Sequence, residues 1–272
     1  MTYERLENWR EKKELLGLLD LKDPPKQLFF KGKWEEGIFN KCAGVVGSRR
    51  MTEYGRRVVE MVVTELVQAG YTIISGFMYG IDQEAHRKAL EIGGKTIAIL
   101  GHGINWPLFE REKKLEAEIL AKGGLIISEW EEQAPTLWTF PLRNRLVVGM
   151  SSRIVVVEAG EKSGSLITAN LAVKYGRELY SVPGMITSRS SAGTNSLIRE
   201  GKARLWMGGK TIEQMKIFDN PILNLLADEE LAVDEIARKL SRRVEEVAGE
   251  LMKLSLSGQV AERGGKYLVA EN

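Results

Sequence analysis

The chain has 272 residues, of which 43% are apolar and 28% are charged, and its formal net charge is +2. This length and composition are ordinary for a globular protein with one sizeable domain, or with one domain and a small appendage. A net charge so close to zero excludes attraction of nucleic acid by a global positive field, so any such affinity has to arise from local clusters of basic residues.

The N-terminal segment, residues 1–35, is charged, and we expect a short, partly helical extension there. Its leucines are suited to docking on a neighbouring surface, and Pro24-Pro25 breaks any helix. The segment has no apolar stretch of a secretion signal, and no window of the chain approaches the ~20 apolar residues of a membrane span. The only cysteine, Cys42, suits a reducing compartment. These features predict a cytoplasmic protein without membrane contact.

From about residue 40 onward, short apolar runs alternate with amphipathic segments. The runs predict buried strands, and the amphipathic segments predict helices. The expected strands are 43–47, 71–75, 96–100, 125–128, 154–157 and 178–182, and the expected helices are 52–69, 81–92, 110–122, 142–150 and 165–175. Such alternation is typical of βαβ units. The sequence therefore predicts an α/β fold over residues 36–212: a Rossmann-like, mostly parallel sheet with helices on both faces.

A change in composition near residues 218–221 predicts a linker, followed by a small domain over residues 219–272. Ser241 fits the N-cap of the third helix of this domain. The expected helices are 222–226, 233–240 and 244–254, and the expected strands are 259–263 and 266–269, joined by a Gly-Gly turn. Three helices and a terminal hairpin predict a winged helix-turn-helix.

Basic and glycine-rich turns follow several of the predicted parallel strands, whose carboxyl ends share the edge of the sheet where ligands bind. In Gly47-Ser48-Arg49-Arg50, Arg49, the backbone N–H groups and the following helix N-terminus are suited to capture an anion. The alternative is a surface turn with solvated arginines. After the second strand, Gly76 lets the backbone approach a ligand closely, whereas Asp82 is better explained as a helix-capping residue than as a catalytic acid.

A second basic turn comprises Phe140, Arg143, Asn144 and Arg145. The two arginines lie two positions apart at a helix start and so point to different sides. We expect one of them to hold phosphate and the other to pair internally, for instance with Glu129 or Glu158. Phe140 either stacks on a nucleobase or fixes the loop as a core aromatic.

A third turn is typical of a strand-to-helix phosphate grip and contains Lys162, Ser163, Gly164, Ser165 and Thr168. It is not a P-loop, because the Gly-Lys-Ser/Thr sequence is missing, and a helix capped by serine without a ligand is the alternative. A dinucleotide site at 101–103 is disfavoured, since the third glycine is absent. Neither histidine has a metal partner at ligand spacing, so we expect no metal and no cofactor.

Taken together, six motifs in this order resemble the DprA/Smf family of DNA-processing proteins. They are Gly47-Ser48-Arg49, Ser75-Gly76-x-x-x-Gly80-Ile81-Asp82, Phe140-Pro141-x-Arg143-Asn144-Arg145, Ser163-Gly164-Ser165-Leu166-x-Thr168-Ala169, Pro183-Gly184 and Gly193-Thr194-Asn195-x-Leu197-Ile198. The resemblance implies a protein not known for catalysis that binds single-stranded DNA, works as a homodimer and helps to load a RecA-type recombinase during natural transformation. It places Arg49 and the Phe140 turn in the DNA pocket, with the Ser163 turn as its wall.

Two other functions are compatible with a Rossmann-like fold. A phosphoribohydrolase-type enzyme needs a Pro-Gly-Gly-x-Gly-Thr turn, which Pro183-Gly184-Met185 does not supply. A transcription regulator would read duplex DNA through basic residues of the winged helix, such as Arg242 and Arg243. We also expect helix N–H groups or arginines to lower the pKa of the carboxylates on the ligand-binding edge, Asp82 among them, which would make them poor bases.

Overall fold

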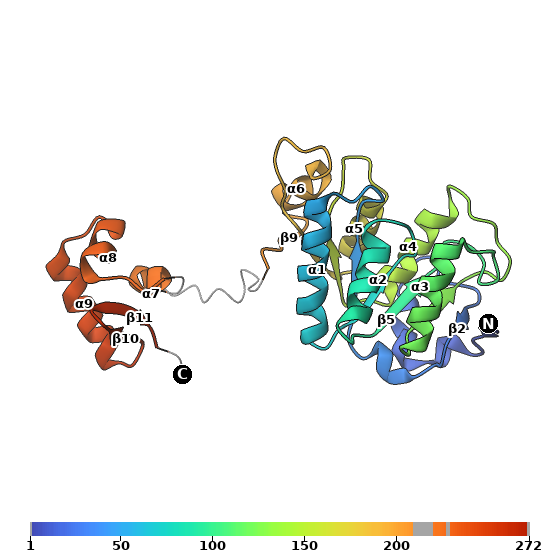
Figure 1. Ribbon diagram of the computed structural model, residues 1–272, viewed down its shortest axis with the longest axis horizontal. Coiled ribbons are helices and arrows are strands. Elements are labelled where there is room, and N and C mark those ends of the chain that lie inside the picture. The colour runs from blue at the N-terminus through green and yellow to red at the C-terminus, as the bar shows by residue number, and fades with distance from the viewer. Residues whose placement is uncertain (1, 209–219, 227–228, 271–272) are drawn as a thin grey trace. The chain divides into compact units, whose positions relative to one another are not determined.

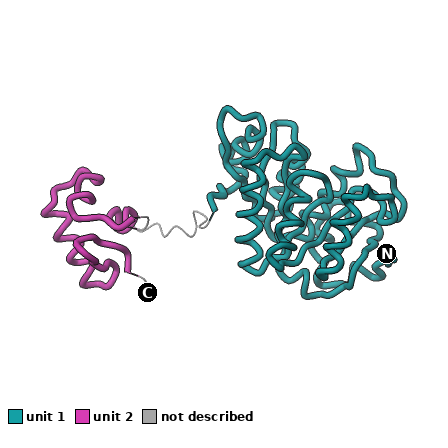
Figure 2. Tube along the Cα trace, in the orientation of Figure 1, with its two compact units in different colours: residues 1–209 teal, residues 210–272 magenta. Residues whose placement is uncertain are grey.

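The structure is a computed structural model that describes residues 2–208, 220–226 and 229–270. It divides into two compact units, Met1–Gly209 and Lys210–Asn272, shown in different colours in Figure 2. Each unit has its own hydrophobic core, because the apolar clusters of the first unit and the cluster of the second share no residue.

The first unit is built on a nine-stranded sheet with the order β1-β2-β6-β5-β4-β3-β7-β8-β9 (Figure 1). The strands are β1 (Glu4–Arg5), β2 (Phe29–Lys31), β3 (Cys42–Val46), β4 (Thr72–Ser75), β5 (Thr96–Ile99), β6 (Leu125–Ser128), β7 (Arg153–Val156), β8 (Glu178–Ser181) and β9 (Arg204–Leu205). Strands β3 to β9 pair in parallel, whereas β1 and β2 pair antiparallel at one edge. The predicted mostly parallel sheet is confirmed.

The chain reverses its direction across the sheet at β3, which has β4 on one side and β7 on the other. Such a switch point leaves a crevice at the carboxyl ends of the two diverging strands, since the connections that follow them leave in opposite directions. The loops after β3, β4 and β7 all line this crevice and carry Arg49, Gly76 and the Ser163 turn, whereas the Phe140 turn reaches it from α4, after β6.

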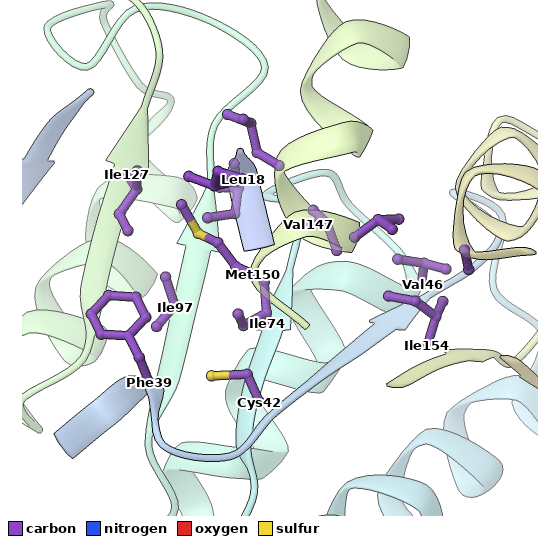
Figure 3. Packing of buried hydrophobic residues seen from close by; sticks show 14 of the residues in the cluster. Leu18, Phe39, Cys42, Val46, Ile74, Ile97, Ile127, Val147, Met150 and Ile154 are labelled. Atoms are coloured by element: carbon purple, nitrogen blue, oxygen red, sulfur yellow. The ribbon is translucent and has the colours of Figure 1, made fainter. Parts of the chain in front are cut away.

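Helices cover both faces of the sheet. They are α1 (Glu53–Gln68), α2 (Ile81–Glu91), α3 (Glu110–Ala121), α4 (Thr139–Gly149), α5 (Ser165–Lys174) and α6 (Ala192–Arg199). Side chains alternate along each strand, so Val45 packs with α1 and α2 while Val46 packs with α4 on the opposite face. Figure 3 shows the core on the face of Val46. There Val147 of α4, and Met150 at the C-cap of this helix, lie in the same apolar cluster as strand residues such as Ile74.

The N-terminal segment differs from the expected extension, because it contributes two strands to the sheet. Phe29 and Phe30 of β2 point to opposite faces and enter different apolar clusters. Three short 3₁₀ helices complete the segment and its junction with β3: η1 (Trp9–Glu11), η2 (Lys13–Leu18) and η3 (Glu36–Phe39). Leu15 and Leu18 of η2 are buried in the core of the first unit.

Helix α4 begins three residues earlier than the expected residue 142. Pro141 therefore lies in the first turn, where its missing N–H breaks no intrahelical hydrogen bond. Because of this earlier start, Phe140 belongs to the same helix as Arg143 and Asn144, which the expected helix already contained. Helix α6 and strand β9 were not among the predicted elements.

The second unit has the winged-helix arrangement predicted from the sequence. It contains α7 (Pro221–Leu226), α8 (Val233–Leu240), α9 (Val244–Leu256), β10 (Val260–Arg263) and β11 (Lys266–Val269). Gly264 and Gly265, with φ of +59° and +81°, form the hairpin turn that favours glycine at both positions. The prediction for Ser241 was wrong: its φ of +52° makes it the C-cap of α8, and Arg243 is the N-cap of α9.

Candidate functional site

A cavity of about 660 Å³ occupies the crevice at the switch point of the sheet. Its walls come from the loops after β3, β4 and β7 and from the first turns of α4 and α5. All site residues predicted from the sequence except Arg145 line it, namely Arg49, Gly76, Phe140, Arg143, Asn144, Lys162, Ser163, Gly164, Ser165 and Thr168. Residues separated by more than a hundred positions in the chain thus meet in one site, as the parallel topology requires.

Arg49 is exposed at the mouth of this cavity, and its guanidinium carbon lies 5.1 Å above the centre of the Phe140 ring. A cation held over an aromatic face in this way gains about 0.5–1 kcal/mol at exposed sites. The Phe140 ring also packs against Gly101, where an added Cβ would be 2.5 Å from a ring carbon. Phe140 therefore holds Arg49 in position, which limits the ring surface available to a stacking base.

The Arg49 turn is fixed by close backbone contacts. The Ser48 hydroxyl accepts a hydrogen bond from the Arg50 N–H at 3.0 Å, and the Ile81 N–H donates to the Ser48 carbonyl oxygen at 3.2 Å. Gly80, with φ of +89°, packs so closely that an added Cβ would be 2.4 Å from the Ser48 carbonyl oxygen. A side chain at position 80 would push the two loops apart, so glycine is required there.

The sequence predicts that the N-terminus of α1 helps to bind an external anion. In the structure this N-terminus is instead occupied by a carboxylate of the protein itself. Glu158, which is 1% exposed, accepts hydrogen bonds from the Thr52 N–H at 2.9 Å and from the Thr52 hydroxyl at 2.6 Å. The Thr52 hydroxyl in turn accepts from the Gly55 N–H at 3.0 Å. A carboxylate of the protein itself thus satisfies the positive end of this helix.

Arg143 is buried, with 3% of its surface exposed, and its guanidinium donates a hydrogen bond to the Ile99 carbonyl oxygen at the end of β5. Its Nε is a buried donor without a partner among the described residues. Gly76 makes room for this guanidinium, since an added Cβ would lie 2.3 Å from one Nη atom and 2.2 Å from an Oδ atom of Asp82. The absence of a side chain at position 76 is therefore needed by the protein's own Arg143 and Asp82.

The expected lowering of the Asp82 pKa was wrong. Burial raises the pKa of the Asp82 carboxyl, and the positive charge of Arg143 offsets only part of this effect. Burial also lowers the pKa of Arg143, and Asp82 opposes that shift. Sequence reasoning missed the direction because desolvation depends on the surrounding fold, whereas the arginines are visible in the chain.

Arg145 takes the internal role foreseen for one of the two arginines. Its guanidinium pairs with Glu129 at 2.7 Å, and both side chains are largely buried. It also donates to the carbonyl oxygens of Asp23 at 2.7 Å and Leu142 at 3.1 Å. Arg145 therefore ties α4 to the N-terminal segment and to the end of β6, away from the cavity lining.

The Ser163 turn forms another wall of the cavity. The hydroxyls of Ser163 and Ser165 are hydrogen-bonded at 2.8 Å, and the Asn144 side-chain amide donates to the Gly164 carbonyl oxygen at 3.4 Å. Helix α5 starts at Ser165, whose N–H donates to the Ser163 hydroxyl at 3.4 Å, and its N-cap residue, Gly164, has no side chain. The first turn of this helix lines the cavity, so the positive end of its dipole lies at this wall. Together with the exposed Lys162, this wall is suited to hold phosphate oxygens.

The surroundings of His86 are structural. His86 is buried between the Gly76 carbonyl oxygen and the Thr96 hydroxyl, each 2.6 Å from a ring nitrogen, and burial lowers its pKa to about 4. In the part of the chain that the structure describes, no three His, Cys, Asp or Glu side chains gather as metal ligands. No helix within the same residues is long and apolar enough to cross a membrane.

Sequence reasoning missed several residues of the cavity. Met78 and Tyr79 line it from the loop after β4, and Leu137, which is 94% exposed, lines it from the segment before α4. The position of Tyr79 directly before Gly80 was the available signal, because it lies in the same turn as the residues that sequence analysis selected.

Comparison with known proteins agrees with this architecture. The family model described as DNA recombination-mediator protein A matches residues 8–216, and the DprA winged helix domain matches residues 219–266. Protein Smf of Escherichia coli is 34% identical over 92% of this chain and 73% of its own length, and DNA processing protein DprA of Bacillus subtilis is 36% identical over 73% and 67%.

Two solved structures show the same fold. DNA processing protein A from Streptococcus pneumoniae superposes with a TM-score of 0.69 at 34% identity, covering 77% of this chain and 72% of that one. DNA processing protein A from Helicobacter pylori, whose structure is described in terms of its single-stranded DNA binding mode, gives a TM-score of 0.66 at 33% identity over 75% and 91%. The cavity, the sheet order, the winged helix and these matches together show that the chain belongs to the DprA/Smf family of DNA recombination-mediator proteins.

Proposed function

We propose that this protein binds single-stranded DNA in the cavity at the switch point of the sheet and does not alter it chemically. The observation that supports this most directly is the charge of the lining, in which Arg49, Arg50, Lys162 and the buried Arg143 face a single carboxylate, Asp82. Guanidinium groups and a helix N-terminus are donors suited to phosphate. The Helicobacter pylori relative described by its single-stranded DNA binding mode supports the choice of ligand.

A binding role without catalysis is supported by how the titratable groups are engaged. Among the described residues, Asp82 is the only carboxylate of the cavity lining, and the nearby His86 contacts the protein with both ring nitrogens. General acid–base catalysis needs a group free to exchange a proton with the reacting atom. Incubation with nucleoside monophosphates, dinucleotides or DNA in the presence of magnesium should yield no turnover, and turnover that the Asp82→Asn variant abolishes would contradict this part of the proposal.

The winged helix is a weaker candidate for DNA recognition. Arg242 pairs with Glu250 at 2.8 Å, and Arg243 pairs with Glu246 at 2.7 Å. These two basic residues, which were expected to read duplex DNA, are thus partly neutralised by carboxylates of the adjoining helix α9. Duplex binding through this domain would have to break these pairs.

The proposed partner is a RecA-type recombinase, and the proposed assembly is a homodimer. Both rest on membership of the recombination-mediator family. Sedimentation velocity on the purified protein tests self-association, and co-precipitation of the host recombinase in the presence and absence of oligothymidine tests the partner. A monomer at micromolar concentration would contradict the first, and no co-precipitation the second.

The DNA ligand itself is tested by titrating the protein into fluorescent oligothymidine or a blunt duplex of equal length. Single strands should bind more tightly, because the bases of a duplex are stacked and its phosphates lie on a stiff helix. If about three phosphates are neutralised, affinity should fall roughly twentyfold between 50 and 200 mM salt. Equal or tighter binding to the duplex would exclude the cavity as a single-strand site.

A further inference from the structure

A second cavity of about 420 Å³ adjoins the first and shares four lining residues with it: Met78, Tyr79, Phe140 and Arg143. It extends from this shared wall to the loop that follows β5 and to the first turn of α3. A strand lying across the shared wall can therefore place neighbouring groups in both cavities at once.

The two cavities differ in chemistry. The second is lined by five aromatic side chains, of which Tyr79, Trp106 and Phe109 are 48%, 37% and 80% exposed, while Phe77 is buried and Phe140 is half-buried. Apart from Arg143 on the shared wall, its charged residues are Arg111 and Glu112, which are of opposite sign. The positive charge that suits phosphate thus lies in the first cavity, and the flat apolar surface that suits a ring lies in the second.

Phe140 does not supply this surface on its own. The Arg49 guanidinium lies over its ring, and Gly101 packs against it. Stacking of a base on that face would displace Arg49 from Phe140. The aromatic side chains with large exposed fractions, Trp106 and Phe109, lie in the loop before α3 and carry no such cover in the hydrogen bonds and ring contacts of the described residues.

His102 gives the second cavity a polar group that a base can use. Its Nδ1 lies 3.0 Å from the Gly103 carbonyl oxygen, and a carbonyl oxygen only accepts, so Nδ1 is the protonated nitrogen. Burial lowers the pKa of His102, which keeps the ring neutral and leaves Nε2 as an acceptor. Every nucleobase presents at least one N–H donor or a π face, so this site selects for a base without selecting strongly among bases.

We propose that the second cavity holds a nucleobase of the bound single strand, stacked on Trp106 and Phe109, while a phosphate of the same strand lies in the first cavity. This inference rests on the proposed function, because the base arrives as part of a strand held by Arg49 and Lys162. Because the two cavities share a wall of four residues, one continuous ligand can occupy both. A nucleic acid strand fits best, since it has phosphates for the first cavity and bases for the second.

The test compares oligothymidine with a fully abasic oligonucleotide of the same length, which keeps every phosphate and lacks every base. Wild-type protein should bind oligothymidine about 5- to 100-fold more tightly, as expected for a stacked base. In the Trp106→Ala, Phe109→Ala double variant this ratio should fall towards one, while affinity for the abasic strand stays unchanged. Trp106→Phe keeps an aromatic ring and should retain most of the ratio.

Trp138→Ala is the matched control, because Trp138 is an exposed tryptophan (54%) outside both cavity linings. It should leave the ratio at its wild-type value. Circular dichroism checks folding, and if the double variant is unfolded the single variant Phe109→Ala takes its place, since that side chain is 80% exposed.

Two kinds of failure are distinguishable. If wild-type protein binds neither oligonucleotide, the proposed function fails and this inference fails with it. If wild-type protein binds both strands equally, or if the double variant keeps the wild-type ratio or weakens both strands alike, only the second-cavity inference is overturned.

Discussion

Arg49 lies on an exposed turn, yet its surroundings restrict where its guanidinium can go. The Phe140 ring lies below it, and Gly80 packs on the backbone of the same turn. A guanidinium held in advance loses less conformational freedom when it binds phosphate, so more of the contact energy appears as affinity.

Replacing Arg49 with alanine should weaken binding to oligothymidine by about 1–3 kcal/mol, because hydrogen bonds to charged groups are the strong ones. Arg49→Lys should recover only part of this loss, since an ammonium cannot form two parallel bonds to phosphate. Fluorescence anisotropy measures both. Arg57→Ala is the matched control, because Arg57 is exposed on α1 outside the cavity and its removal subtracts the same charge. Equal losses at positions 49 and 57 would indicate a diffuse electrostatic effect.

The protonation of His86 is linked to the stability of the fold. Its pKa is about 4 in the native protein, against 6.5 for an ordinary histidine, so the unfolded chain takes up a proton first as the pH falls. The free energy of unfolding should therefore decrease between pH 6.5 and 4, by about 3 kcal/mol from this residue alone.

The pH effect is measured by urea denaturation of wild type and of His86→Gln across this range. Asp82, whose pKa is raised, has the opposite effect on stability as the pH falls, so only the difference between the two proteins isolates His86. That difference should narrow towards low pH. A difference that is constant with pH would show that His86 is not held neutral in the native protein.

At the scale of elements, the sequence predicts the structure correctly where it depends on a local pattern. It does not predict contacts between residues that lie far apart in the chain. The apolar runs and the turns after them placed Arg49 and Ser163 at one edge of the sheet, because parallel strands always align their carboxyl ends. The partner of the α1 N-terminus, Glu158, lies 106 residues from Thr52 and has no local signature. Strand β2 has only three residues, too few for a periodic pattern to stand out.

The N-terminal segment offers a direct test of its place in the core. Leu18 of η2 is fully buried and packs so closely on Gly149 of α4 that an added Cβ there would be 2.7 Å from a Leu18 methyl carbon. Leu18→Ala should lower the free energy of unfolding by about 2–5 kcal/mol, the usual range for a buried leucine. Leu16, which is 51% exposed, is the matched control, and Leu16→Ala should change stability by less than about 0.5 kcal/mol. Similar small effects at both positions would mean that the segment docks only loosely.

At the scale of the whole molecule, the proposed DNA site and the winged helix belong to different units of the chain. Every residue that lines either cavity lies between Val46 and Thr168, within the first unit. The winged helix buries its own apolar residues around Ile236 and Leu251 and needs none from the first unit to do so. The proposed binding of a single strand therefore uses residues of the first unit alone, which leaves the second unit available for another role.

Removal of residues 219–272 should accordingly leave the affinity for oligothymidine within about threefold of the full chain, a change below 1 kcal/mol. The remaining chain keeps the complete sheet and its apolar clusters, so it should also keep its far-ultraviolet circular dichroism and a cooperative thermal transition. The control combines the truncation with Arg49→Ala. If the two units act independently, Arg49→Ala should cause the same loss of affinity for oligothymidine in the truncated and in the full-length chain. If the folded truncated protein instead loses its affinity, the winged helix contributes the DNA contacts, and recognition of DNA through Arg242 and Arg243 becomes the leading explanation.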